Sequence, residues 1–167
     1  MADYERWNDK SREAFKYDAP YFNEDLGNSI NYCKKLIAEG QPEPYRRFEI
    51  ETKDGKHIGF LGAGHFKNIN DVQLGISIME DTLWSKGLGT EAFSLLVDYI
   101  FTAHNLTRLG YSTWSGNERM MRLGKKLGFV EEGRIRRSCF VRGVFYDGMD
   151  MGILREEWLA RKAKASL

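Results

Sequence analysis

Two glycines, Gly87 and Gly89, stand where a strand-like pattern gives way to a helical one, and Lys86 precedes them. Residues 72–79 alternate apolar with polar or small residues, which indicates a strand, and after Gly89 the apolar residues recur with the spacing of an amphipathic helix. The first N–H groups of a helix lack intrahelical partners and lie at the positive end of its dipole, so they can bind an anion. Glycines would let a phosphate approach the backbone, and Lys86 would add a positive charge. A plain strand-to-helix turn that needs flexible residues explains the same glycines.

A second interpretation of the glycines is a dinucleotide-binding domain, because residues 87–92 fit the pattern G-x-G-x-x-A. That pattern places the glycines directly after the strand and an acidic residue at the end of the next strand. Here residues 80–86 intervene, and the next strand-like stretch, residues 106–114, contains no acidic residue. The spacing therefore disfavours a dinucleotide site.

Few other residues offer catalytic chemistry. His65 and Glu80 lie near strand ends on the side of the glycine loop, so they are the candidate general bases. A histidine at a strand end is more often structural, and Glu80 can equally serve to solvate the loop. The three histidines lack metal-ligand spacing, and neither Cys33 nor Cys139 has a histidine close in sequence. The sequence thus disfavours both a metal centre and covalent catalysis.

Composition narrows the class of protein. The 167 residues fit one domain, residues 1–167, and 25 Lys and Arg against 24 Asp and Glu give a net charge of +1. This balance does not favour binding to nucleic acid. Two cysteines far apart indicate a reduced, intracellular protein. The first ten residues lack an apolar core, and no run of about 18 apolar residues occurs, so we expect a cytoplasmic protein without a membrane span.

The apolar spacing and the turn residues divide the chain into helices and strands. We expect helices at residues 4–16, at 23–40, from the glycine loop to about 104, from the N-cap Asn117 to Gly128, and in a charged tail at 155–167. We expect strands at residues 48–52, 57–65, 72–79, 106–114, 129–141 and 145–154, with a hairpin turn at Asp54 and Gly55 and another at Arg142 and Gly143.

This order predicts an α/β (α+β) domain with a mixed, mostly antiparallel sheet. The unit from residue 72 to residue 114 runs from strand through helix to strand. Its two strands should therefore be parallel neighbours with the glycine loop at their carboxyl ends.

Three separated segments of the chain resemble the GNAT superfamily of N-acetyltransferases. WSKGLGTEA, residues 84–92, is similar to the acetyl-CoA pyrophosphate loop of the branch that includes ribosomal-protein alanine N-acetyltransferases. Asn117 followed by KLGF at 126–129 is similar to the next helix of that family. Glu132 and Gly133, then Arg136 and residues 143–147, are similar to its closing hairpin.

The resemblance implies a twisted sheet with helices on both faces and a central parallel pair that splays apart to admit acetyl-CoA. It also implies roles for individual residues along the cofactor. Backbone groups at Ile76, Ser77 and Ile78 would bind the pantetheine, and Asn117 would bind it or orient the thioester. The pyrophosphate would lie on Trp84, Ser85, Lys86, Gly87, Leu88, Gly89 and Thr90, and Lys125 or Lys126 would meet a ribose phosphate, although a solvated helix face explains these lysines equally well.

The activity implied is transfer of the acetyl group from acetyl-CoA to a primary amine by direct attack in a ternary complex. The acceptor stays open among a protein or peptide N-terminus, an amino acid, a polyamine and an amino sugar. The resemblance also implies a homodimer. Departures from the family are Gly124, where many relatives have a tyrosine that protonates the leaving thiolate, Met120 in place of a small polar residue, and no strand before the first helix. Gly124 keeps an alternative open, a non-catalytic acyl-CoA sensor or interaction module on the same fold.

Overall fold

The protein is described by a computed structural model that covers residues 2–7, 9, 12–17, 20, 35–36, 38–40, 46–64 and 72–165. Within these ranges the chain forms helical segments and strands that alternate along the sequence. The helical segments are α1 (Ala2–Trp7), η1 (Glu13–Lys16), η2 (Asp81–Leu83), α3 (Leu88–Ala103), α4 (Glu118–Leu127) and α5 (Arg155–Ala165). The strands are β1 (Arg47–Glu51), β2 (His57–Gly64), β3 (Gln73–Ile78), β4 (Arg108–Trp114), β5 (Val130–Val141) and β6 (Val144–Leu154).

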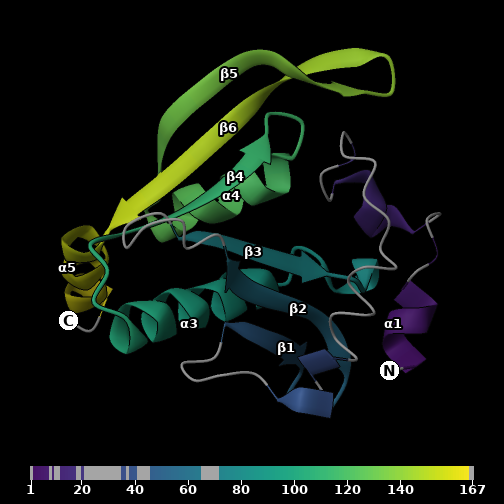
Figure 1. Cartoon of the computed structure of the whole chain (residues 1–167), viewed down its shortest axis with the longest axis horizontal. Helices are drawn as coiled ribbons and strands as arrows, with labels where there is room; N and C mark the ends of the chain where they lie inside the picture. Colours follow the sequence, from purple (N-terminus) through teal and green to yellow (C-terminus); the bar gives the residue numbers. More distant parts are fainter. Residues whose placement is uncertain are drawn as a thin grey trace.

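The strands form one six-stranded sheet in the order β1-β2-β3-β4-β6-β5. Every neighbouring pair is antiparallel except β3 and β4, which are parallel. Figure 1 shows the sheet as two halves, with β1 to β3 below and β4 with the long β5–β6 hairpin above. The predicted mixed α/β fold, with one central parallel pair, is confirmed.

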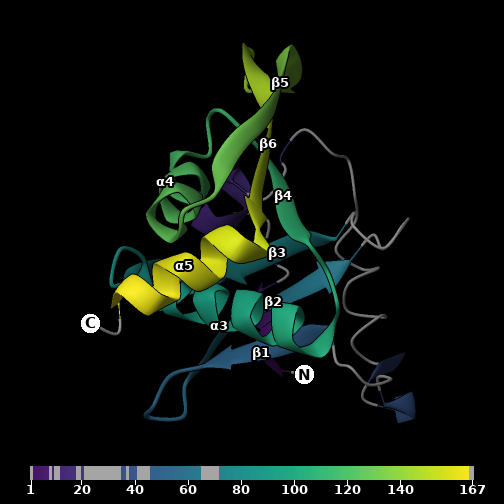
Figure 2. The same cartoon turned by 90° about the vertical axis from the view of Figure 1, so that its left-hand side faces the viewer.

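One face of the sheet carries the main core. On β4 the residues Leu109, Tyr111 and Thr113 are buried, whereas Ser112 between them is exposed, as the two-residue period of a strand requires. Leu109 and Tyr111 belong to one core cluster with residues of α3 and α4. Figure 2 shows α4 beside β4 and β6, and α3 below them. Each fully buried large apolar side chain contributes about 1.5–3 kcal/mol to stability. The core is completed by Phe93, Leu96, Val97, Ile100, Phe101, Phe129, Met151, Ile153 and Trp158.

A smaller cluster covers the other face at the β2 and β3 end. Tyr4 and Trp7 of α1 pack with Met79 and with the ring of Phe60 on β2. The Tyr4 and Phe60 rings stack with centroids 5.9 Å apart. Helical segments therefore cover both faces of the sheet, as predicted.

The single helix predicted at residues 4–16 is wrong. α1 ends at Trp7, and η1 begins only at Glu13, after Arg12 in an extended conformation. Tertiary contacts account for the break, because the Arg12 guanidinium donates a hydrogen bond of 2.7 Å to the Met79 carbonyl and Trp7 is anchored on Glu80. Of the helix predicted at 23–40, only residues 35–36 and 38–39, which are helical, and Gly40, with φ of 73°, lie within the described ranges.

The predicted turns and later helices are confirmed. Arg142 and Gly143 both have positive φ, 51° and 82°, which matches the two-residue turn favoured between twisted antiparallel strands. Gly55 has φ of 81° in the turn between β1 and β2. None of the described helices is long and apolar enough to cross a membrane.

Candidate active site

The parallel strands β3 and β4 separate soon after they meet. They share a single residue pair, Gln73 with Gly110, supported by a hydrogen bond of 3.0 Å from the Gly110 N–H to the Val72 carbonyl. The other edge of β3 stays paired with β2 along its full length, from Gln73 to Ile78. The edge of β3 that faces β4 is therefore open beyond Gln73, and a ligand could add to it as an extra strand.

The antiparallel ladder decides which backbone groups face this opening. The Met79 N–H donates to the Ile58 carbonyl at 2.8 Å, and such pairs alternate along an antiparallel ladder. Ile76 and Ile78 therefore turn their backbone groups toward β4, whereas Ser77 turns its own toward β2. The Ile78 carbonyl already accepts a hydrogen bond of 2.9 Å from the Trp84 indole. Of the three residues expected to bind the pantetheine through the backbone, Ile76 and Ile78 have the suitable orientation.

The glycine loop turns sharply before α3. Ser85 and Gly87 both have left-handed backbone conformations, with φ of 63° and 88°. A side chain at Gly87 would be strained in this conformation, even though no atom beyond the adjacent residues lies within 4 Å of where its Cβ would stand. Ser85, Lys86 and Gly87 are exposed.

The start of α3 has the geometry of an anion site. Its first intrahelical bond runs from the Glu91 N–H to the Gly87 carbonyl, at 3.0 Å. The preceding N–H groups, at Leu88, Gly89 and Thr90, therefore lie in the first turn where helix geometry leaves donors unpaired. Together with the exposed Lys86 they form a helix N-terminus of the kind that can bind an anion.

Asn117 caps α4 as predicted. Its Oδ1 accepts a hydrogen bond of 3.1 Å from the Met120 N–H, and its Nδ2 donates one of 3.2 Å to the Tyr17 carbonyl. The side chain is thus held at both ends. Lys126 is exposed near the other end of α4, and its carbonyl accepts a hydrogen bond from Arg161 of α5.

Glu80 lies in an ion-pair network. It is 7% exposed, and it accepts a hydrogen bond of 3.0 Å from the Trp7 indole. Arg6 lies 2.7 Å away, Lys56 3.5 Å and Arg12 3.6 Å. Burial raises the pKa of Glu80, but the hydrogen bonds from Trp7 and Arg6 and the charges of Arg6 and Lys56 outweigh it, so the pKa falls below its ordinary value. These contacts favour a structural role for Glu80 over that of a general base. His65, the other candidate base, lies outside the described residues.

The space beside Gly124 is filled by Tyr111, a residue that the sequence patterns did not single out. A Cβ at Gly124 would lie 1.9 Å from the Tyr111 hydroxyl oxygen. That hydroxyl donates a hydrogen bond of 3.2 Å to the Met120 carbonyl, and burial raises the pKa of Tyr111. Nothing local in the sequence signals this contact, because it joins β4 to α4.

A polar group lies at the base of the opening, on the sheet face opposite α3. The Ser112 hydroxyl donates a hydrogen bond of 2.7 Å to Asp150 on β6, and it also lies 3.5 Å from the Gln73 Oε1 on β3. Ser112 and Asp150 are exposed. Sequence reasoning missed both residues, since their proximity depends on the β4–β6 register. Among the described residues, no group of three or more His, Cys, Asp or Glu side chains could hold a metal ion.

Sequence comparison identifies the family to which this fold belongs. A family model for the acetyltransferase (GNAT) domain matches residues 2–130, and the chain belongs to that family. It is therefore an acyltransferase that uses acetyl-CoA.

Curated relatives carry related names. The chain is 33% identical over 130 residues to the SPbeta prophage-derived uncharacterized N-acetyltransferase YokL of Bacillus subtilis, covering 78% of this chain and 73% of the relative. It is 28% identical over 146 residues to the putative ribosomal N-acetyltransferase YdaF of the same organism, covering 85% of this chain and 79% of the relative. It is 30% identical over 115 residues to the spermidine N(1)-acetyltransferase of Escherichia coli (strain K12), covering 69% of this chain and 61% of that one.

Solved structures share the fold. The spermidine N-acetyltransferase from Vibrio cholerae, solved in complex with CoA and spermine, gives a TM-score of 0.72 at 22% identity, covering 95% of this chain and 90% of that chain. The ribosomal-protein-alanine N-acetyltransferase from Brucella melitensis gives a TM-score of 0.65 at 18% identity, covering 92% of each chain.

Proposed function

We propose that this protein transfers the acetyl group of acetyl-CoA to a primary amine, and that the amine belongs to a small aliphatic polyamine. The observation that carries the first part is the open edge of β3 beside the N-terminus of α3. The second part rests on the exposed carboxylate of Asp150 at the base of the opening. Relatives named as spermidine acetyltransferases support this choice of acceptor.

The cofactor would lie along the opening between β3 and β4. Ile76 and Ile78 would meet the pantetheine through their backbone groups, and the first turn of α3 with Lys86 would hold the pyrophosphate. Asn117 is fixed by its cap bond, so its remaining hydrogen-bonding capacity would be directed at the pantetheine or thioester. Lys126 would meet the ribose phosphate from solvent.

The reaction can proceed without the tyrosine that many relatives have. Two bound reactants held in line can lower the barrier by roughly 7–11 kcal/mol. A positioned acid or base adds about 10²–10⁴-fold. The neutral amine would attack the thioester carbonyl, and the departing thiolate would take its proton from the new ammonium or from water. The rate should rise with pH, because the acceptor amine must be deprotonated to attack. No tyrosine at position 124 can titrate, so none at that place should cause the rate to fall again in alkali.

Calorimetry tests the cofactor site. Acetyl-CoA should bind more tightly than its 3′-dephospho form or NAD. Gly87→Val should abolish binding, because it strains the loop and blocks the approach of the pyrophosphate, while the circular-dichroism spectrum stays that of a folded protein. Tightest binding of NAD would favour the dinucleotide interpretation instead.

A screen of amine acceptors with thiol detection tests the acceptor. We expect turnover with spermidine and less with a peptide that begins with alanine. Asp150→Asn should raise the KM for spermidine, whereas Glu118→Gln, which changes an exposed carboxylate on α4, should leave it unchanged. Binding of acetyl-CoA without turnover of any amine would support the alternative, a non-catalytic acyl-CoA sensor.

Assembly and location are further parts of the proposal. We propose a homodimer in the cytoplasm. The buried free thiol of Cys139 is compatible with a reducing compartment.

A further inference from the structure

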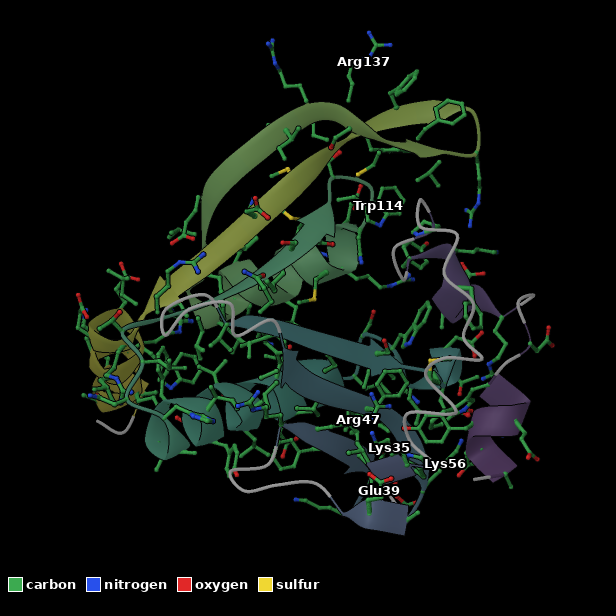
Figure 3. The ribbon with its side chains drawn as sticks, in the orientation of Figure 1. Lys35, Glu39, Arg47, Lys56, Trp114 and Arg137 are labelled. Atoms are coloured by element: carbon green, nitrogen blue, oxygen red, sulfur yellow. The ribbon has the colours of Figure 1, made fainter. Side chains whose placement is uncertain are left out.

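Tyr17 connects the carboxyl ends of the two splayed strands. Its carbonyl accepts hydrogen bonds from the Trp114 indole, at 3.1 Å, and from Asn117, at 3.2 Å. Trp114 is the last residue of β4, and Figure 3 shows it beneath the β5–β6 hairpin. The Tyr17 ring meets the Trp84 ring edge-on with centroids 5.9 Å apart. The Trp84 indole in turn donates a hydrogen bond to the Ile78 carbonyl at the end of β3. We call the described residues 2–7 and 12–17 the N-terminal segment. One residue of this segment, Tyr17, thus spans the opening.

Arg119 holds the same two rings from α4. Its Cζ lies 4.3 Å from the centroid of the Trp84 ring and 4.8 Å from that of Tyr17. A planar guanidinium stacks well on aromatic faces, and tryptophan is the strongest partner. Tyr17, Trp84 and Arg119 therefore form one aromatic latch, contributed by the segment after η1, by the loop before α3 and by the first turn of α4.

The N-terminal segment is also fixed at the start of the same loop. Arg12 donates a hydrogen bond of 2.7 Å to the Met79 carbonyl, and Trp7 donates to Glu80. Residues 79–84 lead into the glycines at the start of α3. The N-terminal segment therefore contacts the loop of residues 79–84 at two places. Arg12 and Trp7 contact its first residues, and Tyr17 contacts Trp84 at its end.

Tyr17 and the proposed acceptor site lie on the same side of the sheet. Trp114 and Ser112 are two residues apart on β4, so they share the face opposite α3. Tyr17 packs over that face at the end of the opening, and Asp150 lies at its base. A shift of the loop on cofactor binding would consequently reach the acceptor side through Tyr17.

We propose that the aromatic latch transmits occupancy of the coenzyme A site to the N-terminal segment, and that Arg119 is the positioning residue that joins them. The proposal rests on the proposed function for the location of coenzyme A. In this arrangement Arg119 touches neither the thioester nor the amine. It fixes Trp84, which precedes the glycine loop, against Tyr17, which lies on the side of the proposed acceptor site. The position of the acceptor relative to the cofactor would depend on this contact.

Hydrogen–deuterium exchange with coenzyme A as the probe tests the coupling. In the wild type, coenzyme A should slow exchange at residues 12–17 as well as at the glycine loop. Arg119→Ala should lose the effect at 12–17 and keep it at the loop, and Arg119→Lys should restore part of it. The control is Arg122→Ala, one turn along α4, whose side chain is 68% exposed and pairs with Glu118. Unchanged protection of 12–17 in Arg119→Ala would overturn the proposal.

Kinetics with spermidine supply the second readout. Arg119→Ala should raise the KM for spermidine roughly five- to tenfold, as expected for the loss of two cation–π contacts, with the calorimetric Kd for coenzyme A unchanged. An equal rise in both constants would place Arg119 in the coenzyme A site and contradict a positioning role. If no amine is acetylated, the proposed function fails, whereas the exchange experiment still decides for or against the latch.

Discussion

Tyr111 explains why residue 124 is a glycine. The family resemblance suggests a missing proton donor at this position, but the structure shows a packing requirement, because the Tyr111 hydroxyl oxygen lies 1.9 Å from where a Cβ would stand. The ring carbon Cζ of Tyr111 lies 2.7 Å from the same point. Introducing a tyrosine at 124 would therefore displace Tyr111 before it could act as an acid, so Gly124→Tyr is not a clean test of catalysis.

The pair should behave as one packing unit. Gly124→Ala should destabilise the protein by about 1–3 kcal/mol, because it overpacks the junction of β4 and α4. Tyr111→Leu alone should cost a similar or larger amount through the cavity it leaves. In the double variant the two losses should be less than additive, since the smaller side chain makes room for the methyl group. Urea unfolding of the four proteins measures the coupling, and strict additivity would show that the two residues do not interact.

The raised pKa of Tyr111 predicts a loss of stability in alkali. In the unfolded chain the phenol titrates near its ordinary value of 10.0, whereas in the folded protein burial keeps it protonated to higher pH. Its contribution is therefore fully present below pH 10 and declines above it, at about 1.4 kcal/mol for each pH unit. Denaturant unfolding of Tyr111→Phe between pH 9 and pH 11 should show a shallower decline than the wild type. Equal slopes would mean that Tyr111 ionises normally in the folded protein.

Local signals and contacts between elements differ in how well the sequence reveals them. The cap at Asn117 and the glycine turn before α3 could be predicted, because capping and turn formation depend on neighbouring residues. Tyr111 and Asp150 could not, since their partners, Gly124 and Ser112, lie on other elements. Glu80 was considered as a general base or as a residue that solvates the loop, and the sequence did not reveal its ion pair with Arg6 of α1.

At the level of elements, Glu80 attaches α1 to the end of β3. Glu80→Gln leaves Arg6, Arg12 and Lys56 without their shared carboxylate. We expect a loss of about 2–3 kcal/mol, below the 3–5 kcal/mol of fully buried pairs, because Arg6 and Lys56 are about half exposed. Thermal unfolding measures it. The turnover number should change far less than the 10²–10⁴-fold of a lost base, and a drop of that size with stability intact would restore Glu80 as the catalytic base.

The same contact has a defined pH dependence. Because the pKa of Glu80 is lowered in the folded protein, its stabilising contribution is present above the ordinary value of 4.5 and is lost as the pH falls through the lowered folded value. Acid unfolding of Glu80→Gln should accordingly depend less on pH below about 4.5 than that of the wild type. An identical acid profile would show that Glu80 carries no shift.

Helix and strand positions followed from periodicity wherever a long segment contributed one face to the core. The strands and the helices α3 and α4 are of this kind, whereas α5 was expected as a charged tail helix. The Arg142 and Gly143 turn fixed the last hairpin. α1 and η1 failed because hydrogen bonds from Trp7 and Arg12 to the β3 end decide where the helix stops. Sequence patterning predicted that β3 and β4 are parallel neighbours, whereas the splay was expected only from the family resemblance.

At the scale of the whole molecule, the far end of the β5–β6 hairpin carries exposed apolar side chains. The hairpin extends beyond the rest of the sheet in Figure 1, and Figure 3 shows Arg137 on its outer side. Phe140 and Phe145 are 56% and 52% exposed, and their ring centroids lie 4.8 Å apart. The Arg137 guanidinium covers Phe145 at 4.8 Å. Neighbouring apolar rings exposed to this extent are typical of an association surface.

We therefore expect this surface to join two copies of the chain. Sedimentation should give a species of twice 19.3 kDa that dissociates on dilution. The double substitution Phe140→Glu and Phe145→Glu should give the monomer, because it places like charges across the symmetric contact and removes its apolar area. Leu159→Glu is the matched control, since Leu159 is also 56% exposed but lies on α5, and it should leave the dimer intact. A wild type that sediments only as the monomer would refute the dimer, and a dimer that survives the double substitution would place the interface elsewhere on the molecule.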